Sequence, residues 1–175
     1  MPLTPFEAQL LRLSKSNQKQ LKAFRDGVYI TSTTGRSLDD LRDQATSDRL
    51  DFAEACLSVG NKLMRTRPIE YRAAIGRFYY AMYHAMRATV FYANDGDDYQ
   101  RHETLPQHTP SDFPSNAVWE NRLKNARGYR NDADYDPYPI AAVDFSVAAK
   151  DLQGHAHTLL LIVRTYLRAK GCGHV

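Results

Sequence analysis

Apolar residues recur at alternating intervals of three and four between Phe145 and Tyr166, and this spacing restricts the fold more than any other feature of the chain. A period near 3.6 residues places these side chains on one face of a helix, whereas a strand would alternate every second residue. The stripe comprises Phe145, Ala148, Leu152, His155, Leu159, Ile162 and Tyr166. It predicts one long helix from about Ile140 to Ala169. Because His155 lies on the apolar stripe, we expect it to be a core histidine and not a ligand.

Three further segments show the same period, and strand-type alternation is nearly absent. Ser37, a residue type that caps helices, precedes a helix predicted over residues 38–63. A second helix begins near Pro68, whose fixed backbone angle suits a first turn, and ends near Tyr92. A third spans residues 116–130. The expected core-facing residues are Leu38, Leu41, Ala45, Phe52, Cys56, Val59 and Leu63 in the first helix, and Trp119, Leu123 and Ala126 in the third. The pattern therefore predicts an all-α protein.

The domain organisation follows from these helices. We expect an N-terminal helical extension and connector over residues 1–36, a helical bundle over residues 37–170 and a flexible tail over residues 171–175. Apolar spacing from Phe6 to Phe24 predicts one or two amphipathic helices in the extension, with residues 31–36 as the connector. The polar, proline-containing residues 94–114 form a long loop, and a loop of this length in a compact domain is expected to be either partly ordered by a partner or functional.

Composition excludes several classes of protein. A net charge of +3 is too small to indicate nucleic-acid binding by itself, and two cysteines are too few for a disulfide framework. No apolar run approaches the ~18 residues of a membrane span, so we expect a soluble cytoplasmic protein. The chain has no glycine-rich phosphate loop and no nucleophile elbow. Neither His102, Glu103 and His108 nor the tail residues Cys172 and His174 make a convincing ligand set, so no metal or cofactor is predicted.

The segment Arg127–Tyr135 concentrates two arginines, two aspartates and two tyrosines in nine residues. Guanidinium groups bind phosphates through paired hydrogen bonds, so Arg127 and Arg130 are candidate phosphate ligands, with Asn131 and Asp134 at the same site. An ordinary helix C-terminus explains the same residues without a ligand, because arginine complements the helix dipole and Asn and Asp open turns. A structural polar network that closes the end of the bundle or a dimer is a further alternative.

A second polar cluster lies on the helix predicted from Pro68. Arg77, Tyr80, His84 and Arg87 follow one another at intervals of three, four and three, and so share one face. The opposite side carries Ile75, Phe78, Met82 and Ala85. Two arginines that flank a tyrosine and a histidine can bind a phosphate and move a proton. A solvated face with one packed aromatic side chain is the simpler interpretation.

Two segments together resemble a known family. The run YRAAIGRFYYAMYHA, residues 71–85, is similar to the second-helix signature of HEPN domains, the helical nucleotide-binding domains of prokaryotes and higher eukaryotes. The segment Arg127–Tyr135 resembles the Arg-x-x-Arg-x-x-Ala-Asp-Tyr ending of many of the same proteins. The order of the motifs and the variable loop between them also fit. The resemblance covers residues 38–170 and leaves residues 1–36 outside it.

This resemblance implies a four- or five-helix bundle, mostly up-and-down, which is usually dimeric with the functional cleft at the dimer interface. Active members are metal-independent ribonucleases in toxin–antitoxin, phage-defence and RNA-processing systems, which implies a cognate antitoxin or nucleotidyltransferase protein as partner. They carry an arginine, four to six residues and then a histidine. Here the arginine falls at Arg130 and the histidine position at Tyr135. A tyrosine is ionised about one part in a thousand at neutral pH, a cost of roughly 4 kcal/mol.

Three functional hypotheses follow. In the first, the domain binds RNA or a nucleotide through Arg127 and Arg130 without catalysis, in a prokaryotic toxin–antitoxin or defence setting, and Asp132 and Asp134 orient the guanidinium groups. In the second, it is a metal-independent ribonuclease in which Arg130 steadies the phosphate and His84 replaces the missing base. In the third, it is a non-catalytic dimerisation or interaction module whose surface is built by Tyr79, Tyr80 and Tyr83.

Overall fold

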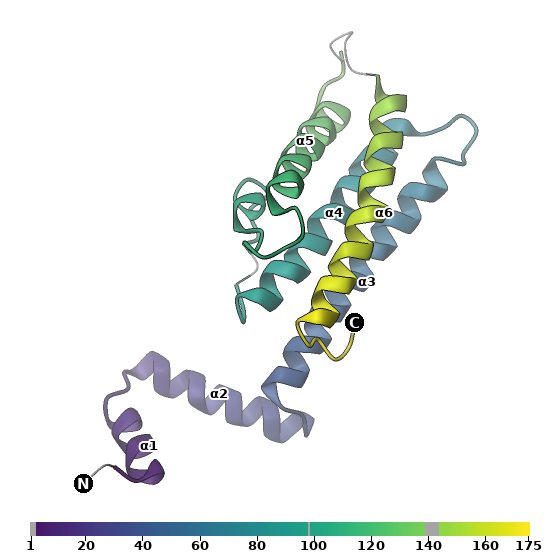
Figure 1. Cartoon of the computed structure of the whole chain (residues 1–175). Helices are drawn as coiled ribbons and strands as arrows, with labels where there is room; N and C mark the ends of the chain where they lie inside the picture. Colours follow the sequence, from purple (N-terminus) through teal and green to yellow (C-terminus); the bar gives the residue numbers. More distant parts are fainter. Residues whose placement is uncertain (1–2, 98, 139–143) are drawn as a thin grey trace. The chain divides into compact units, whose positions relative to one another are not determined.

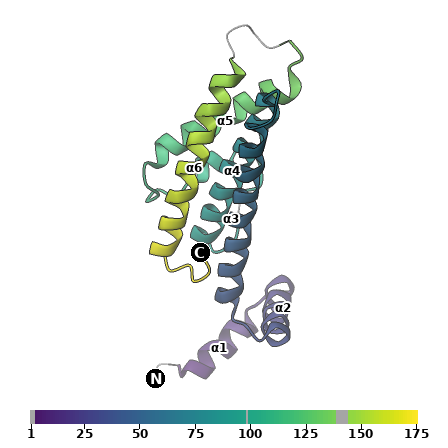
Figure 2. The ribbon, with the colours of Figure 1, turned by 90° about the vertical axis from the view of Figure 1, so that its right-hand side faces the viewer.

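The computed structural model describes residues 3–97, 99–138 and 144–175, and all regular elements in these ranges are helices (Figures 1 and 2). The all-α prediction is therefore confirmed. The chain divides into two compact units, Met1–Leu41 and Arg42–Val175. Among the described helices, none combines the length and the apolar character that a membrane crossing requires.

The first unit contains two helices, α1 (Pro5–Ser14) and α2 (Gln18–Thr34). Each begins with a capping box, in which the side chains of residues N-cap and N3 bond to each other's backbone N–H groups. Helix α2 runs to Thr34, so the connector expected at residues 31–36 is wrong for its first four residues. The helix ends where Gly35 adopts a left-handed conformation with φ of 66°. Neither helix contains a buried residue.

The second unit contains most of α3 (Leu38–Leu63), together with α4 (Tyr71–Ala93), α5 (Asn116–Tyr135) and α6 (Phe145–Ala169). These helices alternate in direction, as Figure 1 shows. The up-and-down order brings α3 beside α6, although they are the first and last helices of the bundle. A short 3₁₀ helix, η1 (Leu105–His108), lies between α4 and α5.

Helix α4 is the core of this unit. It packs against both α5 and α6, and 14 of its 23 residues are buried. The predicted apolar side, Ile75, Phe78, Met82 and Ala85, is fully inaccessible to solvent. Alanines at 0% exposure allow neighbouring helices to approach α4 closely. The predicted polar stripe is the least buried side of the same helix, since Arg77 is exposed and Tyr80, His84 and Arg87 are half-buried.

The core-facing stripe predicted for α3 is wrong in register. Leu38, Phe52 and Val59 are exposed at 54%, 55% and 41%, whereas Cys56 is buried as expected. The residues of α3 that are buried are Asp43, Thr46, Leu50, Ala53, Cys56, Leu57 and Gly60. This face combines small and polar residues with only two leucines, so a count of large apolar side chains does not reveal it. The predicted N-cap is confirmed, because Ser37 Oγ accepts from Asp40 N at 3.1 Å.

The predicted start of α4 also needs correction. Helix α4 begins at Tyr71 and not at Pro68, whose peptide bond with Arg67 is cis. Pro68 lies in the turn after α3, which is closed by a hydrogen bond of 2.7 Å from Thr66 Oγ1 to the carbonyl of Leu63. Helix α6 begins at Phe145, where Asp144 caps it through the N–H groups of the first turn. The expected start near Ile140 lies outside the described residues.

The loop after α4 and the C-terminal tail both pack onto the bundle. Leu105 and Phe113 are buried at 0% and 2% exposure and anchor the loop to the core. The tail, predicted to be flexible, lies against α3: Cys172 is buried, and Gly173 N donates to Asp43 Oδ2 at 2.7 Å. The cysteines Cys56 and Cys172 are both free thiols.

The contact between Gly60 and Phe78 gives a test of this packing. A Cβ at Gly60 would lie 2.5 Å from Cε1 of Phe78, which is itself fully buried. We expect Gly60→Ala to lower the free energy of unfolding by about 1–3 kcal/mol through overpacking, although alanine is the better helix former. Urea denaturation measures this change.

Gly154→Ala in α6 is the matched control, because a Cβ at Gly154 meets nothing within 4 Å. Helix propensity alone should raise its free energy of unfolding by up to about 1 kcal/mol. Equal effects of the two substitutions would contradict the close approach of α3 to α4.

Candidate functional site

The segment Arg127–Tyr135 lies within α5 and does not follow it, because α5 continues to Tyr135 and not to Arg130 as predicted. The residues that suggested a turn support the helix instead. Asp134 lies one turn after Arg130, and its Oδ2 is 2.8 Å from Arg130 Nε. Such an ion pair between residues i and i+4 stabilises the helical conformation.

Arg72 in the first turn of α4 holds the end of α5 in place. Its Nε donates to the carbonyl of Ala133 at 2.8 Å, and its Nη2 donates to that of Asp136 at 2.5 Å. These carbonyls belong to the end of the helix, where they lack intrahelical donors and where a positive charge is favourable. The Arg72 guanidinium also lies 5.0 Å from the ring centroid of Phe145, so one side chain joins α4, α5 and α6. No pattern in the sequence singles out Arg72 for this role.

Arg130 is the most constrained residue of the segment, with a side chain only 18% exposed. Besides its ion pair with Asp134, its Nη2 donates to Tyr80 Oη at 3.0 Å and its Nη1 to Asn131 Oδ1 at 3.2 Å. The guanidinium lies 5.6 Å from the ring centroid of Tyr80 and 4.9 Å from that of Tyr135. Tyr135 itself is 69% exposed. Residues of both α4 and α5 thus hold Arg130 in place, while Tyr135, one of its two aromatic neighbours, is exposed to solvent.

Arg127 lies one turn before Arg130 on α5 and reaches the loop that precedes the helix. Its Nη2 donates to Glu103 Oε1 at 2.5 Å. The Glu103 side chain is 73% exposed, so this ion pair is largely solvated and contributes little stability. Residues three apart on a helix are surface neighbours, so Arg127 and Arg130 present their guanidinium groups on one side of α5.

The neighbour of Glu103 is His102, which the sequence analysis considered only as a metal ligand. Its ring stacks on Tyr83, with centroids 4.1 Å apart, and its Nδ1 lies 2.5 Å from Tyr79 Oη. Burial lowers the pKa of His102, and the positive charges of Arg130, Arg127 and Arg87 lower it further. Burial also raises the pKa of Tyr79. His102 is therefore a neutral imidazole at neutral pH, within the electrostatic field of both arginines of the segment.

His84 is another aromatic neighbour of Tyr80. Its ring centroid is 6.2 Å from that of Tyr80, 5.0 Å from that of Tyr83 and 4.6 Å from that of Phe52. Arg130 and His84 thus both lie against the Tyr80 ring, one from α5 and one from α4. The exposed Arg77 lies 5.9 Å from the same ring, so the predicted ligand residues Arg77, Tyr80 and Arg130 do form one neighbourhood.

The tyrosines proposed for an interaction surface are mostly inside the protein. Tyr79 and Tyr83 are 2% and 4% exposed, so these two side chains are not available to a partner. Of the three, only Tyr80 is half-buried. The interaction-module hypothesis therefore loses the surface on which it was based.

His155 is half-buried and not fully part of the core. Its Nδ1 lies 3.4 Å from Asp151 Oδ2, one turn earlier in α6, and its ring packs edge-on against Trp119 at 6.4 Å. Arg122 of α5 lies over the same Trp119 ring, so His155 is held in a packed environment at the edge of the core. Within the described ranges, no group of three or more His, Cys, Asp or Glu side chains has the arrangement of a metal site.

A search with family models, with curated proteins and with solved structures finds no significant match to this chain. The chemistry of the site is therefore inferred from its geometry. Arg127 and Arg130 can bind a phosphate. Tyr135 offers an exposed aromatic ring beside Arg130, and His102 is a neutral imidazole within the field of both arginines.

The environment of His102 predicts how it titrates. Its pKa is lowered in the folded state, so the unfolded chain binds more protons below the ordinary pKa of about 6.5. The free energy of unfolding is therefore not reduced by His102 well above pH ~6.5. It decreases as the pH falls from ~6.5 towards the lowered pKa of the folded state. We expect the NMR signal of the His102 ring to titrate below pH 6.5, and Arg127→Ala to raise the midpoint.

Lys124→Ala is the control, because Lys124 lies on the same helix and is paired with Glu120. It should leave the His102 midpoint unchanged, since the charges that lower the pKa of His102 are those of Arg130, Arg127 and Arg87. A titration midpoint of His102 at or above pH ~6.5, or one that Arg127→Ala leaves unchanged, would contradict the environment described for His102.

Proposed function

We propose that this protein is a HEPN-like helical domain that binds RNA or a nucleotide through a phosphate at Arg127 and Arg130. The observation that supports it is that the charges of Arg127 and Arg130 both act on His102, while the exposed ring of Tyr135 lies beside Arg130. The resemblance of residues 71–85 and 127–135 to HEPN motifs supports the same proposal.

The two arginines have different parts in the proposed site. Arg130 is oriented in advance by Asp134 and Tyr80, so little side-chain entropy is lost when it binds a ligand. Arg127 bonds to the solvated carboxylate of Glu103, which a phosphate can replace at small cost. A dianionic phosphate then gains charge-assisted hydrogen bonds from the exchange.

Tyr135 occupies the position at which the HEPN pattern has a proton-transferring histidine. In this proposal Tyr135 contributes to binding and not to proton transfer. An exposed aromatic ring is a stacking platform for a nucleobase, and such stacking contributes about 1–3 kcal/mol per base. The ring lies 4.9 Å from the Arg130 guanidinium, which places a stacked base next to a bound phosphate. This arrangement favours binding over catalysis.

The setting is proposed from the resemblance alone. It is that of a cytoplasmic homodimer in a prokaryotic toxin–antitoxin or defence system, with a cognate antitoxin or a nucleotidyltransferase protein as partner.

Binding to a fluorescein-labelled single-stranded RNA, followed by fluorescence anisotropy, tests the proposed function. We expect Arg127→Ala to weaken binding about tenfold and to reduce the salt slope by about one, because one phosphate contact is lost. Tyr135→Ala should weaken binding by about 1–3 kcal/mol, while Tyr135→Phe retains the stacking ring and the affinity.

Lys124→Ala is the control, because Lys124 lies on the same helix and is already paired with Glu120. Thermal melting of each variant separates loss of binding from loss of folding, which matters most for the partly buried Arg130. If Arg127→Ala and Tyr135→Ala bind RNA as the parent does, the proposed site is wrong.

A second candidate function, metal-independent RNA cleavage, is favoured by one observation. His102 is neutral, stacks on Tyr83 and lies in the field of Arg127 and Arg130, so it is a candidate base besides His84. In the tautomer in which Nδ1–H donates to Tyr79 Oη, the second ring nitrogen is free to accept a proton from a ribose 2′-hydroxyl. Arg130 would then stabilise the charge that develops on the phosphate.

Cleavage of a labelled RNA in the presence of EDTA distinguishes the two histidines. If the protein cleaves, we expect His102→Ala to lower the rate by about 10²–10⁴, the usual contribution of a general base, and His84→Gln to leave most of it. The reverse result would return the role to His84. Absence of cleavage with intact RNA binding would leave the binding function alone.

A further inference from the structure

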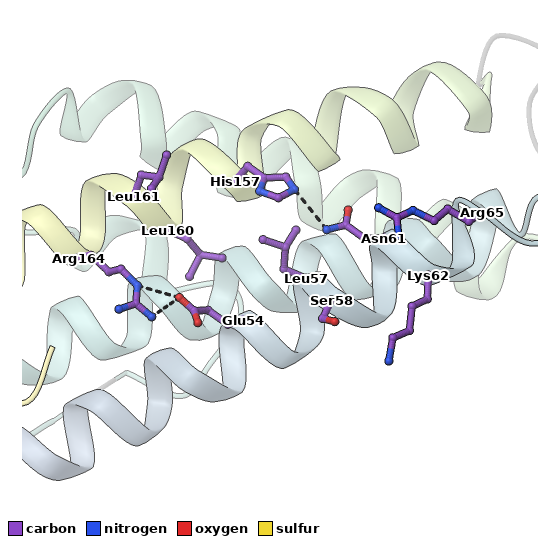
Figure 3. A pocket seen from close by; sticks show the side chains of 10 residues that line it. All are labelled: Glu54, Leu57, Ser58, Asn61, Lys62, Arg65, His157, Leu160, Leu161 and Arg164. Atoms are coloured by element: carbon purple, nitrogen blue, oxygen red, sulfur yellow. Dashed lines mark hydrogen bonds and ion pairs between the residues drawn. The ribbon is translucent and has the colours of Figure 1, made fainter.

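A groove runs between α3 and α6 on a different part of the second unit from Arg130 (Figure 3). Its volume is about 440 Å³, and no residue of α5 lines it. Leu57 from α3 and Leu160 from α6 lie between the two helices and form the floor, at 8% and 4% exposure. Leu161 adjoins them at the edge and is 68% exposed.

Two polar bridges cross this groove, on either side of the leucines. At one end, Arg164 Nε donates to Glu54 Oε1 at 2.8 Å. At the other, the Asn61 side chain donates to His157 Nε2 at 3.3 Å and accepts from Gln153 Nε2 at 2.6 Å. Figure 3 shows both bridges as dashed lines. Glu54 and Asn61 are seven residues apart, so the apolar floor between them extends over about two helical turns, roughly 10 Å.

The charge of the groove is positive. Arg164 is balanced by Glu54, but within the part of the chain that the structure describes no carboxylate is paired with Lys62 or Arg65. Both side chains are exposed at the end of α3, beyond the Asn61 bridge. An apolar floor with unbalanced positive charge at one end complements an apolar surface that carries carboxylates.

The shape of the groove selects the kind of ligand. Sites for small molecules enclose most of the ligand surface, whereas here Leu161, Ser58 and Lys62 are all exposed. A long, shallow groove between two helices instead matches the apolar stripe of a third helix. A second copy of this chain would bring Lys62 and Arg65 near the same positive groove, so charge favours an acidic partner over self-association.

We propose that the groove between α3 and α6 binds an acidic amphipathic helix of a partner protein. Apolar side chains of that helix, spaced by three or four residues, pack on Leu57, Leu160 and Leu161. Its carboxylates pair with Lys62 and Arg65. This site is independent of the phosphate site at Arg130, so the protein can hold a partner and an RNA at different surfaces.

The test uses the full chain and a fluorescein-labelled peptide of about 16 residues, a helix former with leucines at i, i+4 and i+7 and glutamates on its flanks. We expect saturable binding with Kd below about 100 µM, and at least a tenfold rise in Kd for Leu161→Asp and for the double variant Lys62→Glu/Arg65→Glu. A peptide with lysines in place of the glutamates should bind at least tenfold more weakly.

Val118→Asp and Lys124→Glu are the controls, because they make an apolar-to-acidic change and a charge reversal at solvent-accessible positions of α5, and they should leave Kd unchanged. Scrambling the peptide sequence should abolish binding. The proposal is overturned if the acidic peptide does not bind or if the groove and control variants bind it equally. It is also overturned if sedimentation shows a dimer of the parent protein that Leu161→Asp dissociates, since the groove would then be a self-association surface.

RNA binding of the same variants keeps this proposal separate from the phosphate site. Leu161→Asp should bind labelled RNA with the affinity of the parent protein. Loss of RNA binding in Lys62→Glu/Arg65→Glu without loss of peptide binding would assign the positive charge to RNA and overturn the acidic-partner proposal.

Discussion

The burial of α4 is the constraint on which the rest of the second unit depends. A helix that is covered by three neighbours has no wide polar face, and α4 accordingly buries 14 of its 23 residues. Small residues make this possible, because Gly60 of α3 leaves room for the ring of Phe78 and the alanines of α4 allow α5 and α6 to approach. The polar groups of α4 that belong to the candidate site are therefore confined to its one accessible side, where Tyr80 lies.

The polar contacts between α4 and α5 form one network that stabilises the bundle and contains residues of the proposed site. Arg72 binds carbonyls at the end of α5, and Arg130 binds Tyr80 in return, so the two helices are held to each other from both sides. A network of this kind stabilises the bundle only if its members are paired, and Asp134 supplies the pairing for Arg130. The same pairing orients Arg130 next to the exposed Tyr135, so the structural role of this residue coincides with the binding role that we propose for it.

The candidate site was predictable from the sequence only in part. Spacing alone placed Tyr80 and His84 on one accessible face, and the arginines of residues 127–135 were evident from their density. His102 and Arg72 were not found, because both reach the site from a distant part of the chain. One lies in a loop without periodicity, and the other is a single arginine in a helical first turn. The buried loop residue Leu105 was an available signal, since an apolar anchor indicates that a long polar loop is packed onto the core.

The sequence by itself determined the all-α class and the bounds of α3 to within a residue, because a 3.6-residue period and an N-cap serine are local properties of the chain. Tertiary structure decided which face of α3 is buried, since that choice depends on the fit of Gly60 against Phe78 and not on hydrophobicity alone. It also decided that α5 continues to Tyr135, because Arg72 provides the donors that its terminal carbonyls lack. Contacts between residues about sixty positions apart leave no local pattern, and so only the folded chain reveals them.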